Sequence, residues 1–297
     1  MLENKYDFMI LFDVENGNPN GDPDADNMPR IDPETNLGIV TDVCLKRKVR
    51  NYVDTAKSIG ELSEGYGIYI QEKKPLNRID AQAYEYINVE LDDKGIIKDK
   101  KADKENIDLQ VRDFMCRNFF DVRTFGAVMT THVKNNLNAG QVRGPVQLSF
   151  ARSINPIYPQ NITITRGAVA TEKDFAEKGS STMGRKHIVP YGLYKAEGYI
   201  SAPLSQVTGF NSRDLALLWQ ALINMFEHDR AAARGKMSMR ELIVFKHNCK
   251  LGNAPSHKLF DLVKITTSED SPRAYSDYAV TIAEELIPEG VTMERLI

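Results

Sequence analysis

Apolar residues are densest in a run from Tyr6 to Val14, where strand-forming side chains occupy nearly every position. A continuous apolar run, as opposed to an alternation of apolar and polar residues, is typical of a central strand that is buried on both faces. The run therefore predicts the middle strand of a sheet. Shorter strand-like runs predict further strands at 66–71, 124–131, 144–150, 161–166, 191–202, 241–246 and 259–265.

Two other segments repeat their apolar residues every three or four positions, which is the period of an amphipathic helix. The first is predicted to begin at Thr41 or Asp42, which are suitable N-cap residues, and to end near Ile59. Its apolar stripe consists of Leu45, Val49, Tyr52 or Val53, and Ala56. The second is predicted at 212–228, with core positions Leu215, Leu218, Trp219, Leu222 and Phe226.

The order of these elements predicts a fold class. Strands separated by one early and one late amphipathic helix indicate an α+β fold with a ferredoxin-like core that carries insertions. Residues 60–108 include a charged run and are predicted to be an insertion with a solvated tip. Residues 155–190 contain a long polar stretch and are predicted to form a protruding hairpin. The core then consists of 1–59, 109–154 and 191–297.

The first strand breaks into a loop with a high density of glycine, proline and asparagine, from Asp13 to Asp26. Gly17 and Gly21 can adopt positive φ, while Pro19 and Pro23 fix φ. Asparagine also tolerates the left-handed region. The composition therefore predicts consecutive tight turns, and not a flexible linker.

Carboxylates in and after this loop allow one interpretation as ligands of Mg²⁺ or Ca²⁺. The candidates are Asp13, Asp22, Asp24, Asp26 and Asp32. A calcium-loop template beginning at Asp22 fails, because its glycine position holds Asn27 and its final glutamate position holds Pro33. The sequence favours the alternative, in which these carboxylates cap turns, and we predict no metal site.

The chain has 297 residues, a net charge of -3 and 42% hydrophobic residues, which is ordinary for a globular protein. No apolar run approaches the roughly 18 residues that a membrane helix requires, and the first residues lack the features of a signal peptide. Cys44, Cys116 and Cys249 are widely spaced and form no CxxC pair, which argues against a disulfide framework. We therefore expect a soluble, cytoplasmic protein with no membrane partner.

Enzyme signatures are missing from the sequence. The five histidines form no HExxH or comparable pair, and no nucleophile-elbow, phosphate-loop or dinucleotide-binding glycine pattern occurs. His247 and His257, which flank Cys249, are interpreted as ordinary polar loop residues. The sequence therefore predicts neither a catalytic site nor a cofactor.

A basic cluster is the most specific chemical feature, because four of the five residues from Lys46 to Arg50 are cationic. Lys46, Arg47 and Arg50 are spaced three and four apart, so they share a face of the predicted helix beside its apolar stripe. Arginine makes bidentate contacts with phosphate, and lysine contributes a point charge. We interpret this face as a phosphate-binding surface, and the alternative is a solvated charged face. With a net negative charge, any binding of nucleic acid must come from such local patches.

Two further segments have features of RNA contact. Residues 143–150 match part of the strand motif of RNA-recognition modules, although the internal aromatic residues that stack bases are missing. RNA bound there would be held by its backbone, and an ordinary core strand after Arg143 is an equal alternative. In the polar protrusion, Met183 precedes Arg185 and Lys186, and it either separates bases as an apolar wedge or packs back onto its own hairpin.

The loop and the first helix together carry a resemblance to a known family. Residues 13–23, 29–31 and 41–50 closely resemble the backbone subunit of type I CRISPR surveillance complexes (Cascade), in the type I-C variant, and the resemblance covers essentially the whole chain. It implies a RAMP-superfamily palm of modified ferredoxin-like, RNA-recognition-motif form, with inserted finger (web) and thumb elements. It also implies a non-catalytic scaffold that polymerises as a helical filament along the CRISPR guide RNA and presents the guide in segments for pairing with target DNA.

The resemblance further implies partners and a division of the chain. The partners are the guide RNA, target DNA through the guide, copies of the same chain, the guide-processing, large and small subunits and, indirectly, an effector helicase-nuclease. The implied parts are palm (1–59), finger or web (60–108), palm (109–154), thumb (155–190) and palm (191–297). The predicted RNA-binding residues are Asn18, Asn20, Lys46, Arg47, Arg50, Gln141, Arg143, Arg166, Met183, Arg185 and Lys186.

A second hypothesis, from another class, is a metal-dependent ribonuclease. Related backbone subunits of type III complexes cut target RNA with a loop aspartate, and Asp22, Asp24 or Asp26 would be the candidate here. Prolines between these carboxylates and the lack of a nearby histidine in the sequence make the loop poorly shaped for paired metal ions. We therefore favour the scaffold.

Overall fold

The computed structural model describes residues 1–90, 97–98, 103–129, 141–178 and 181–297. Its main feature is an antiparallel sheet in which the apolar run forms the central strand, as predicted. In order across the sheet, the strands are β14 (Val291–Arg295), β11 (Lys236–His247), β1 (Tyr6–Gly17), β10 (Thr182–Ile200), β8 (Ala151–Pro156) and β4 (Leu37–Val40). Two shorter strands also pair with β10, β7 (Val146–Leu148) and β9 (Gln160–Arg166).

The remaining elements lie on the sheet or form two outlying parts. The helices are α1 (Asp42–Ser58), α2 (Leu76–Tyr86), α3 (Lys104–Asn118), α4 (Phe120–Phe125), α5 (Glu172–Lys178), α6 (Ala202–Thr208), α7 (Ser212–Asn224) and α8 (Ser256–Phe260), with 3₁₀ turns at Pro23–Ala25, Tyr275–Asp277 and Glu284–Leu286. The two-stranded pairs are β2 (Gly21–Asp22) with β3 (Met28–Pro29), β5 (Gly126–Val128) with β6 (Gln141–Arg143), and β12 (Val263–Thr267) with β13 (Tyr278–Ile282). In the part of the chain that the structure describes, no helix combines the length and the apolar character needed to cross a membrane.

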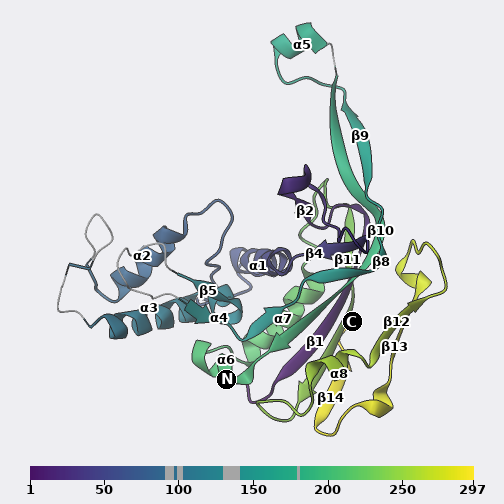
Figure 1. Cartoon of the computed structure of the whole chain (residues 1–297). Helices are drawn as coiled ribbons and strands as arrows, with labels where there is room; N and C mark the ends of the chain where they lie inside the picture. The colour runs from purple at the N-terminus through teal and green to yellow at the C-terminus, as the bar shows by residue number, and fades with distance from the viewer. Residues whose placement is uncertain (91–96, 99–102, 130–140, 179–180) are drawn as a thin grey trace.

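Both faces of the sheet are covered, as a continuous apolar strand requires. Phe8, Ile10 and Phe12 belong to the apolar cluster shared with α1 and α7. Met9 and Leu11, which alternate with them, belong to the cluster formed with α8 and the β12–β13 hairpin. Figure 1 shows these two layers on either side of β1. The sheet is therefore a rigid base from which the functional segments project.

The predicted insertion is a helical unit with its own core, formed by α2, α3, α4, β5 and β6. The strand predicted at 66–71 is wrong, since Gly67 makes only an isolated bridge with Phe119. The strand predicted at 124–131 is confirmed for 126–128, which form β5, but residues 124–125 end α4. Residues 130 and 131 lie outside the described residues. Since α3 runs across residue 108 and Val142 belongs to this core, the unit extends beyond the predicted boundary.

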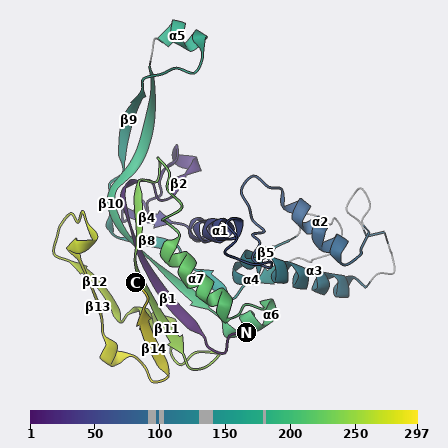
Figure 2. The same cartoon turned by 180° about the vertical axis from the view of Figure 1, so that it is seen from behind.

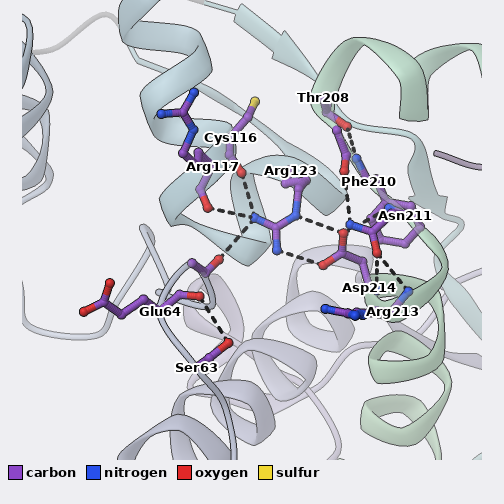
Figure 3. A network of polar contacts seen from close by, with 12 residues as sticks. Ser63, Glu64, Cys116, Arg117, Arg123, Thr208, Phe210, Asn211, Arg213 and Asp214 are labelled. Carbon is purple, nitrogen blue, oxygen red and sulfur yellow. Dashed lines mark hydrogen bonds and ion pairs between the residues drawn. The ribbon is translucent and has the colours of Figure 1, made fainter.

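One buried arginine fastens the helical unit to the sheet (Figure 3). The guanidinium of Arg123 donates to both carboxylate oxygens of Asp214 in α7, at 2.8 and 3.1 Å. It also donates to the carbonyl oxygens of Cys116 at 2.7 Å and Gly65 at 3.2 Å. Because a buried charge that loses its partner is strongly destabilising, this network holds α3, α4 and α7 in a fixed arrangement.

The predicted protrusion is present as a long hairpin of β9 and the first part of β10, with α5 at its tip (Figures 1 and 2). Residues 160–166 pair with 182–188 in a regular antiparallel ladder. The same strand, β10, then enters the sheet and pairs with β1. The hairpin is thus a continuous extension of a central strand, and not a separately attached loop.

The C-terminal half differs from the predicted pattern at several boundaries. The helix predicted at 212–228 ends at Asn224, and β11 begins at Lys236, before the predicted 241. The strand predicted at 259–265 is wrong in its first part, because residues 259–260 belong to α8 and β12 begins at Val263. The strand predicted at 144–150 is shorter, Val146–Leu148. Short apolar runs do not distinguish buried helix from strand, which explains these errors.

The interpretation of His247 as a loop residue is wrong. It ends β11 and is fully buried. Its Nδ1 accepts a hydrogen bond from the backbone N–H of Asn253 at 2.8 Å, so Nε2 donates to Asp7 Oδ2, also at 2.8 Å. Asp7 further accepts from Lys5 at 2.6 Å and Ser256 at 2.9 Å. The cluster is fully hydrogen-bonded and joins β1, β11 and α8.

Candidate nucleic-acid interface

The loop after β1 is ordered by close backbone packing, and its predicted turns are confirmed. Positive φ occurs at Asn16 (51°) and Asn27 (59°), so the prediction that Gly17 and Gly21 adopt it is wrong. These glycines are needed instead because they have no Cβ, which lets neighbouring atoms approach closely. A Cβ on Gly17 would lie 1.9 Å from the carbonyl oxygen of Arg234, and one on Gly21 would lie 1.9 Å from Asn27 Oδ1.

Two asparagines join this loop to its neighbours. Asn20 Oδ1 accepts from the backbone N–H and the hydroxyl of Thr41, both at 3.0 Å, which fixes the loop against the start of α1. Asn18 donates from Nδ2 to the carbonyl oxygen of Asn27 at 2.7 Å, and its backbone N–H donates to the carbonyl oxygen of Ala233 at 2.9 Å. The predicted N-cap Thr41 is confirmed. Three distant segments therefore meet at one place.

These segments border an open groove of about 780 Å³, which we call the loop groove. Its cationic and amide lining residues are Asn18, Asn20, Asn27, Arg30, Arg47, Lys48 and Arg234. Two apolar side chains in it are well exposed, Val43 at 64% and Phe150 at 54%. Cations beside an exposed aromatic ring are the combination with which proteins hold single-stranded nucleic acid.

Two buried polar atoms at the groove lack a hydrogen-bond partner among the described residues. Asn18 Oδ1 and Arg30 Nε are buried and have no hydrogen-bond partner within the described ranges. Burying such atoms unpaired costs about 1–3 kcal/mol each. Buried unpaired atoms also occur elsewhere among the described residues, but two of them at one groove require an explanation, and a ligand site is one.

The predicted basic face of α1 is largely turned inward. Lys46 is 9% exposed and pairs with Asp42 at 2.8 Å, while Arg50 is 7% exposed and pairs with Asp121 at 2.8 Å. The alternative of a solvated charged face is therefore wrong for these two residues. Their direct contact with phosphate stays a prediction, and it would require both side chains to leave their carboxylates. In the structure, the Arg50–Asp121 pair fixes α1 against the helical unit, whereas the Lys46–Asp42 pair lies within α1.

Arg47 is the member of the predicted trio that reaches the groove. It is partly exposed, and its Nη1 donates to the carbonyl oxygen of Ile70 at 2.6 Å. A guanidinium has five N–H donors, so one such bond leaves capacity for a ligand. Lys48, at the groove floor, forms an ion pair with Asp229, and burial lowers the pKa of Lys48 to about 8. Arg234 pairs with the same carboxylate.

Three of the candidate metal ligands, Asp13, Asp22 and Asp32, have other partners. Asp13 is buried and pairs with Arg240 at 2.8 Å, and Asp22 pairs with Arg30 at 3.3 Å. Asp22 also caps the following turn by accepting from the backbone N–H of Asp24 at 3.2 Å. Hydrogen bonds from Arg152 and from the backbone of the next turn lower the pKa of Asp32. Among the described residues, no group of three histidine, cysteine or carboxylate side chains is arranged to hold a metal ion.

The hairpin presents its predicted residues to solvent. Met183 is 79% exposed, so the alternative in which it packs back onto the hairpin is wrong. Met183 pairs with Thr165 and Arg185 with Thr163, which puts both side chains on one face of the ribbon. Lys186 lies toward the hairpin base and donates to the carbonyl oxygen of Ala232 at 2.8 Å, next to the loop groove.

The other predicted RNA-binding residues lie apart from the groove. Arg166 is exposed on the hairpin and donates to the carbonyl oxygen of Ala168 at 2.9 Å. Gln141 and Arg143 form strand β6 and are both exposed. Arg143 lines a different cavity of about 390 Å³, formed with β10 and α6. Gly140, in the same predicted loop, lies outside the described residues.

Several groove residues are missing from the predicted RNA-binding residues, among them Asn27, Lys48, Arg30, Phe150 and Arg234. Arg30 and Phe150 lie within sequence patterns that had drawn attention, but neither pattern indicated that their side chains face the same groove. Arg234 comes from a turn before β11 without a recognisable motif. Its proximity depends on the antiparallel pairing of β1 with β11, which no local pattern reveals.

Comparisons with known proteins agree on one family. The sequence pattern of the family described as CRISPR-associated protein Cas7 matches residues 4–283. The CRISPR-associated protein Cas7 of Haloferax volcanii is 23% identical over 298 residues, covering 95% of this chain and 81% of that protein. A chain of a solved CRISPR RNA-guided surveillance complex, described as pre-nicking, has a similar fold with a TM-score of 0.51 and 13% identity, covering 81% of this chain and 78% of that one.

Proposed function

The chain belongs to the family of CRISPR-associated Cas7 proteins, and on that premise we propose that it is a non-catalytic subunit that binds a CRISPR guide RNA. The observation that carries the proposal is the loop groove, in which Asn18, Asn20 and Arg47 lie together with an exposed Phe150. Phosphate contacts to such a groove hold any guide sequence, because they carry no base information.

The proposed assembly is a helical filament of this chain along the guide, which presents the guide in segments to target DNA. Its other partners would be the guide-processing, large and small subunits of a type I-C Cascade, with an effector helicase-nuclease acting indirectly in the cytoplasm. The resemblance of the loop and α1 to the type I-C backbone subunit supports this finer assignment. The small net charge of -3 is consistent with it, since packing between subunits requires that basic residues be confined to grooves.

We further propose that the sheet is a ferredoxin-like palm. With the intervening elements, among them the edge strand β4, taken as insertions, its main elements come in the order β1, α1, β8, β10, α7 and β11. This is the β–α–β–β–α–β order of that fold, and the neighbouring strands are antiparallel. The helical unit would then be the finger or web, and the hairpin of β9 and β10 would be the thumb.

Each predicted residue receives a role in this proposal. Direct contacts are assigned to the groove residues Asn18, Asn20 and Arg47, to the partly exposed Lys186, and to four exposed residues elsewhere, Gln141, Arg143, Arg166 and Arg185. Met183 acts as a wedge between bases at the face of the thumb. Arg50 positions α1 through its buried ion pair with Asp121, and Lys46 stabilises the first turns of α1 through its pair with Asp42.

The proposal is tested by purifying the chain with its partner subunits from cells that express the matching CRISPR array. Guide-length RNA should copurify with the wild type and with Lys264→Glu, a control on the exposed face of β12, but not with Arg47→Glu. Wild-type complexes without RNA, or equal RNA in both variants, would overturn it. Incubating the complex with complementary RNA and Mg²⁺ tests the ribonuclease hypothesis, which requires regular cleavage that Asp24→Ala abolishes.

A further inference from the structure

A second groove lies at the opposite end of α1 from the loop groove, where the last turn of α1 meets the start of α2. It has a volume of about 610 Å³, and we call it the distal groove. Four cationic side chains line it and all are exposed, namely Lys57, Lys73, Lys74 and Arg78. Asp54 also lines it, but this carboxylate already accepts a hydrogen bond from Gln71 at 2.8 Å.

Most cations of the distal groove are not paired with a carboxylate in the described part of the chain, unlike the buried cations of α1. Within the residues that the structure describes, Lys57, Lys74 and Arg78 have no ion-pair partner, whereas Lys46, Lys48 and Arg50 each have one. The single pair at the distal groove joins Lys73 to Glu72 at 3.6 Å, with both side chains mostly exposed, so solvent and salt weaken it. Four positive charges on ordered backbone repel each other and favour an anionic ligand.

The two grooves are connected along α1. Arg47 lines the loop groove and donates to the carbonyl oxygen of Ile70, while Ile68 and Gln71, on either side of Ile70, line the distal groove. The backbone N–H of Ile70 in turn donates to Asp121, which is the ion-pair partner of Arg50. The segment between the grooves is therefore fixed against the helix.

We propose that the distal groove is a second phosphate-binding site for the same RNA strand, which runs along α1 from the loop groove onto the helical unit. The inference rests on the proposed function. The 17 residues of α1 span about 25 Å, or about seven nucleotides at a stacked rise of about 3.4 Å. Continuity with the loop groove favours RNA over an acidic protein surface as the occupant.

The test uses two oligouridylates of different length, because only a strand long enough to span α1 can occupy both grooves at once. A 4-nucleotide strand reaches one groove, whereas a 12-nucleotide strand reaches both. Binding of each to the purified chain is followed by fluorescence anisotropy across a range of salt concentrations. The double variant Lys74→Ala/Arg78→Ala is compared with Lys258→Ala/Lys264→Ala, which removes two exposed lysines from α8 and β12.

For the 12-nucleotide strand, the distal-groove variant should bind more weakly, with a salt slope that is less steep by about 1.4, since each lost phosphate contact with a single strand contributes about 0.7. The 4-nucleotide strand should bind the variant and the wild type equally. If the wild type bound the long strand and the variant matched it, the distal groove would not be an RNA site. A variant that lost self-association while keeping the wild-type salt slope would also overturn the inference, in favour of an acidic protein surface. Failure of the wild type to bind either strand would instead refute the proposed function.

Discussion

The loop groove and the protruding hairpin both carry cationic side chains, but they hold them in opposite ways. At and beside the groove, Lys46, Lys48 and Arg50 are buried and paired with carboxylates. The partners of Lys48 and Arg50 come from distant parts of the chain, whereas Lys46 pairs with Asp42, one turn earlier in α1. On the hairpin, Met183 and Arg185 are exposed on a two-stranded ribbon that extends away from the sheet (Figure 2). The groove is thus shaped before a ligand arrives, whereas the hairpin can adjust to one.

In the proposed function, the two regions therefore have different roles: the residues around α1 position the groove, and the hairpin side chains contact the ligand. Buried ion pairs around α1 hold the backbone and the neighbouring loop in place, which preorganises the groove and lowers the ordering cost of binding. A ribbon of two strands has few buried contacts of its own, so its side chains add affinity without fixing a shape. Changes in the two regions should therefore affect different measurements.

The largest expected effect is on stability, at the buried ion pair between Arg50 in α1 and Asp121 in α4. Arg50→Ala leaves Asp121 as a buried carboxylate without its charged partner, and we expect the free energy of unfolding to fall by about 3–5 kcal/mol. Urea denaturation measures this change. Arg185→Ala, an exposed hairpin arginine, is the control and should alter it by no more than about 0.5 kcal/mol. Equal effects from both variants would contradict the comparison.

The next effect is on RNA affinity without a change in stability. Phe150 is half exposed, so Phe150→Ala removes little packing, but it removes a surface on which a base can stack, worth about 1–3 kcal/mol. Phe150→Trp keeps an aromatic face and should retain the affinity. Isothermal titration with a short guide RNA distinguishes the two variants. An unchanged affinity for Phe150→Ala would show that the ring does not contact RNA.

A smaller effect concerns the salt dependence of binding. Arg47→Ala should make the slope of log K against log salt less steep by about 0.7 and should weaken all guide sequences similarly. Arg47→Lys, which keeps the charge, should largely restore the slope. A loss confined to some guide sequences would instead indicate that Arg47 contacts bases.

The smallest expected effect on stability is on the hairpin, at Met183. Because this side chain is 79% exposed, Met183→Ala should change the free energy of unfolding by less than about 0.5 kcal/mol. If Met183 separates bases, the same variant should reduce the chemical reactivity of the regularly spaced guide nucleotides that it unstacks, and Met183→Leu should preserve it. Reactivity that is identical in all three proteins would exclude the wedge.

Much of the fold could be predicted from the sequence, since its strongest signals are local. The apolar run of β1, the Thr41 cap and stripe of α1, the core face of α7 and the protruding hairpin all follow from residues within one window. The helical unit could not be predicted in the same way. Its helices are short or weakly amphipathic, and its core joins residues from Tyr69 to Val142, so tertiary packing decides its structure.

For the candidate site, the sequence identified the correct loop and helix but not the correct exposure of each charge. Lys46 and Arg50 share a helix face with Arg47, as spacing alone predicts. The neutralisation of Lys46 by Asp42 is local, but that of Arg50 depends on where Asp121 lies, 71 residues later in the sequence. For the same reason, the position of Arg234 in the groove could not be predicted from the sequence, because it depends on the pairing of β1 with β11. Long-range pairing selects which member of a charged face is available to a ligand.

The buried pair of Arg123 with Asp214 also has a consequence for how the chain folds during its synthesis on the ribosome. Arg123 precedes its partner Asp214 by 91 residues. At a synthesis rate of roughly 5–20 residues per second, on the order of ten seconds pass before α7 can be made and supply that carboxylate. During this interval the helical unit exists without its anchor, so its final attachment is a late event, delayed until the C-terminal half of the protein has emerged.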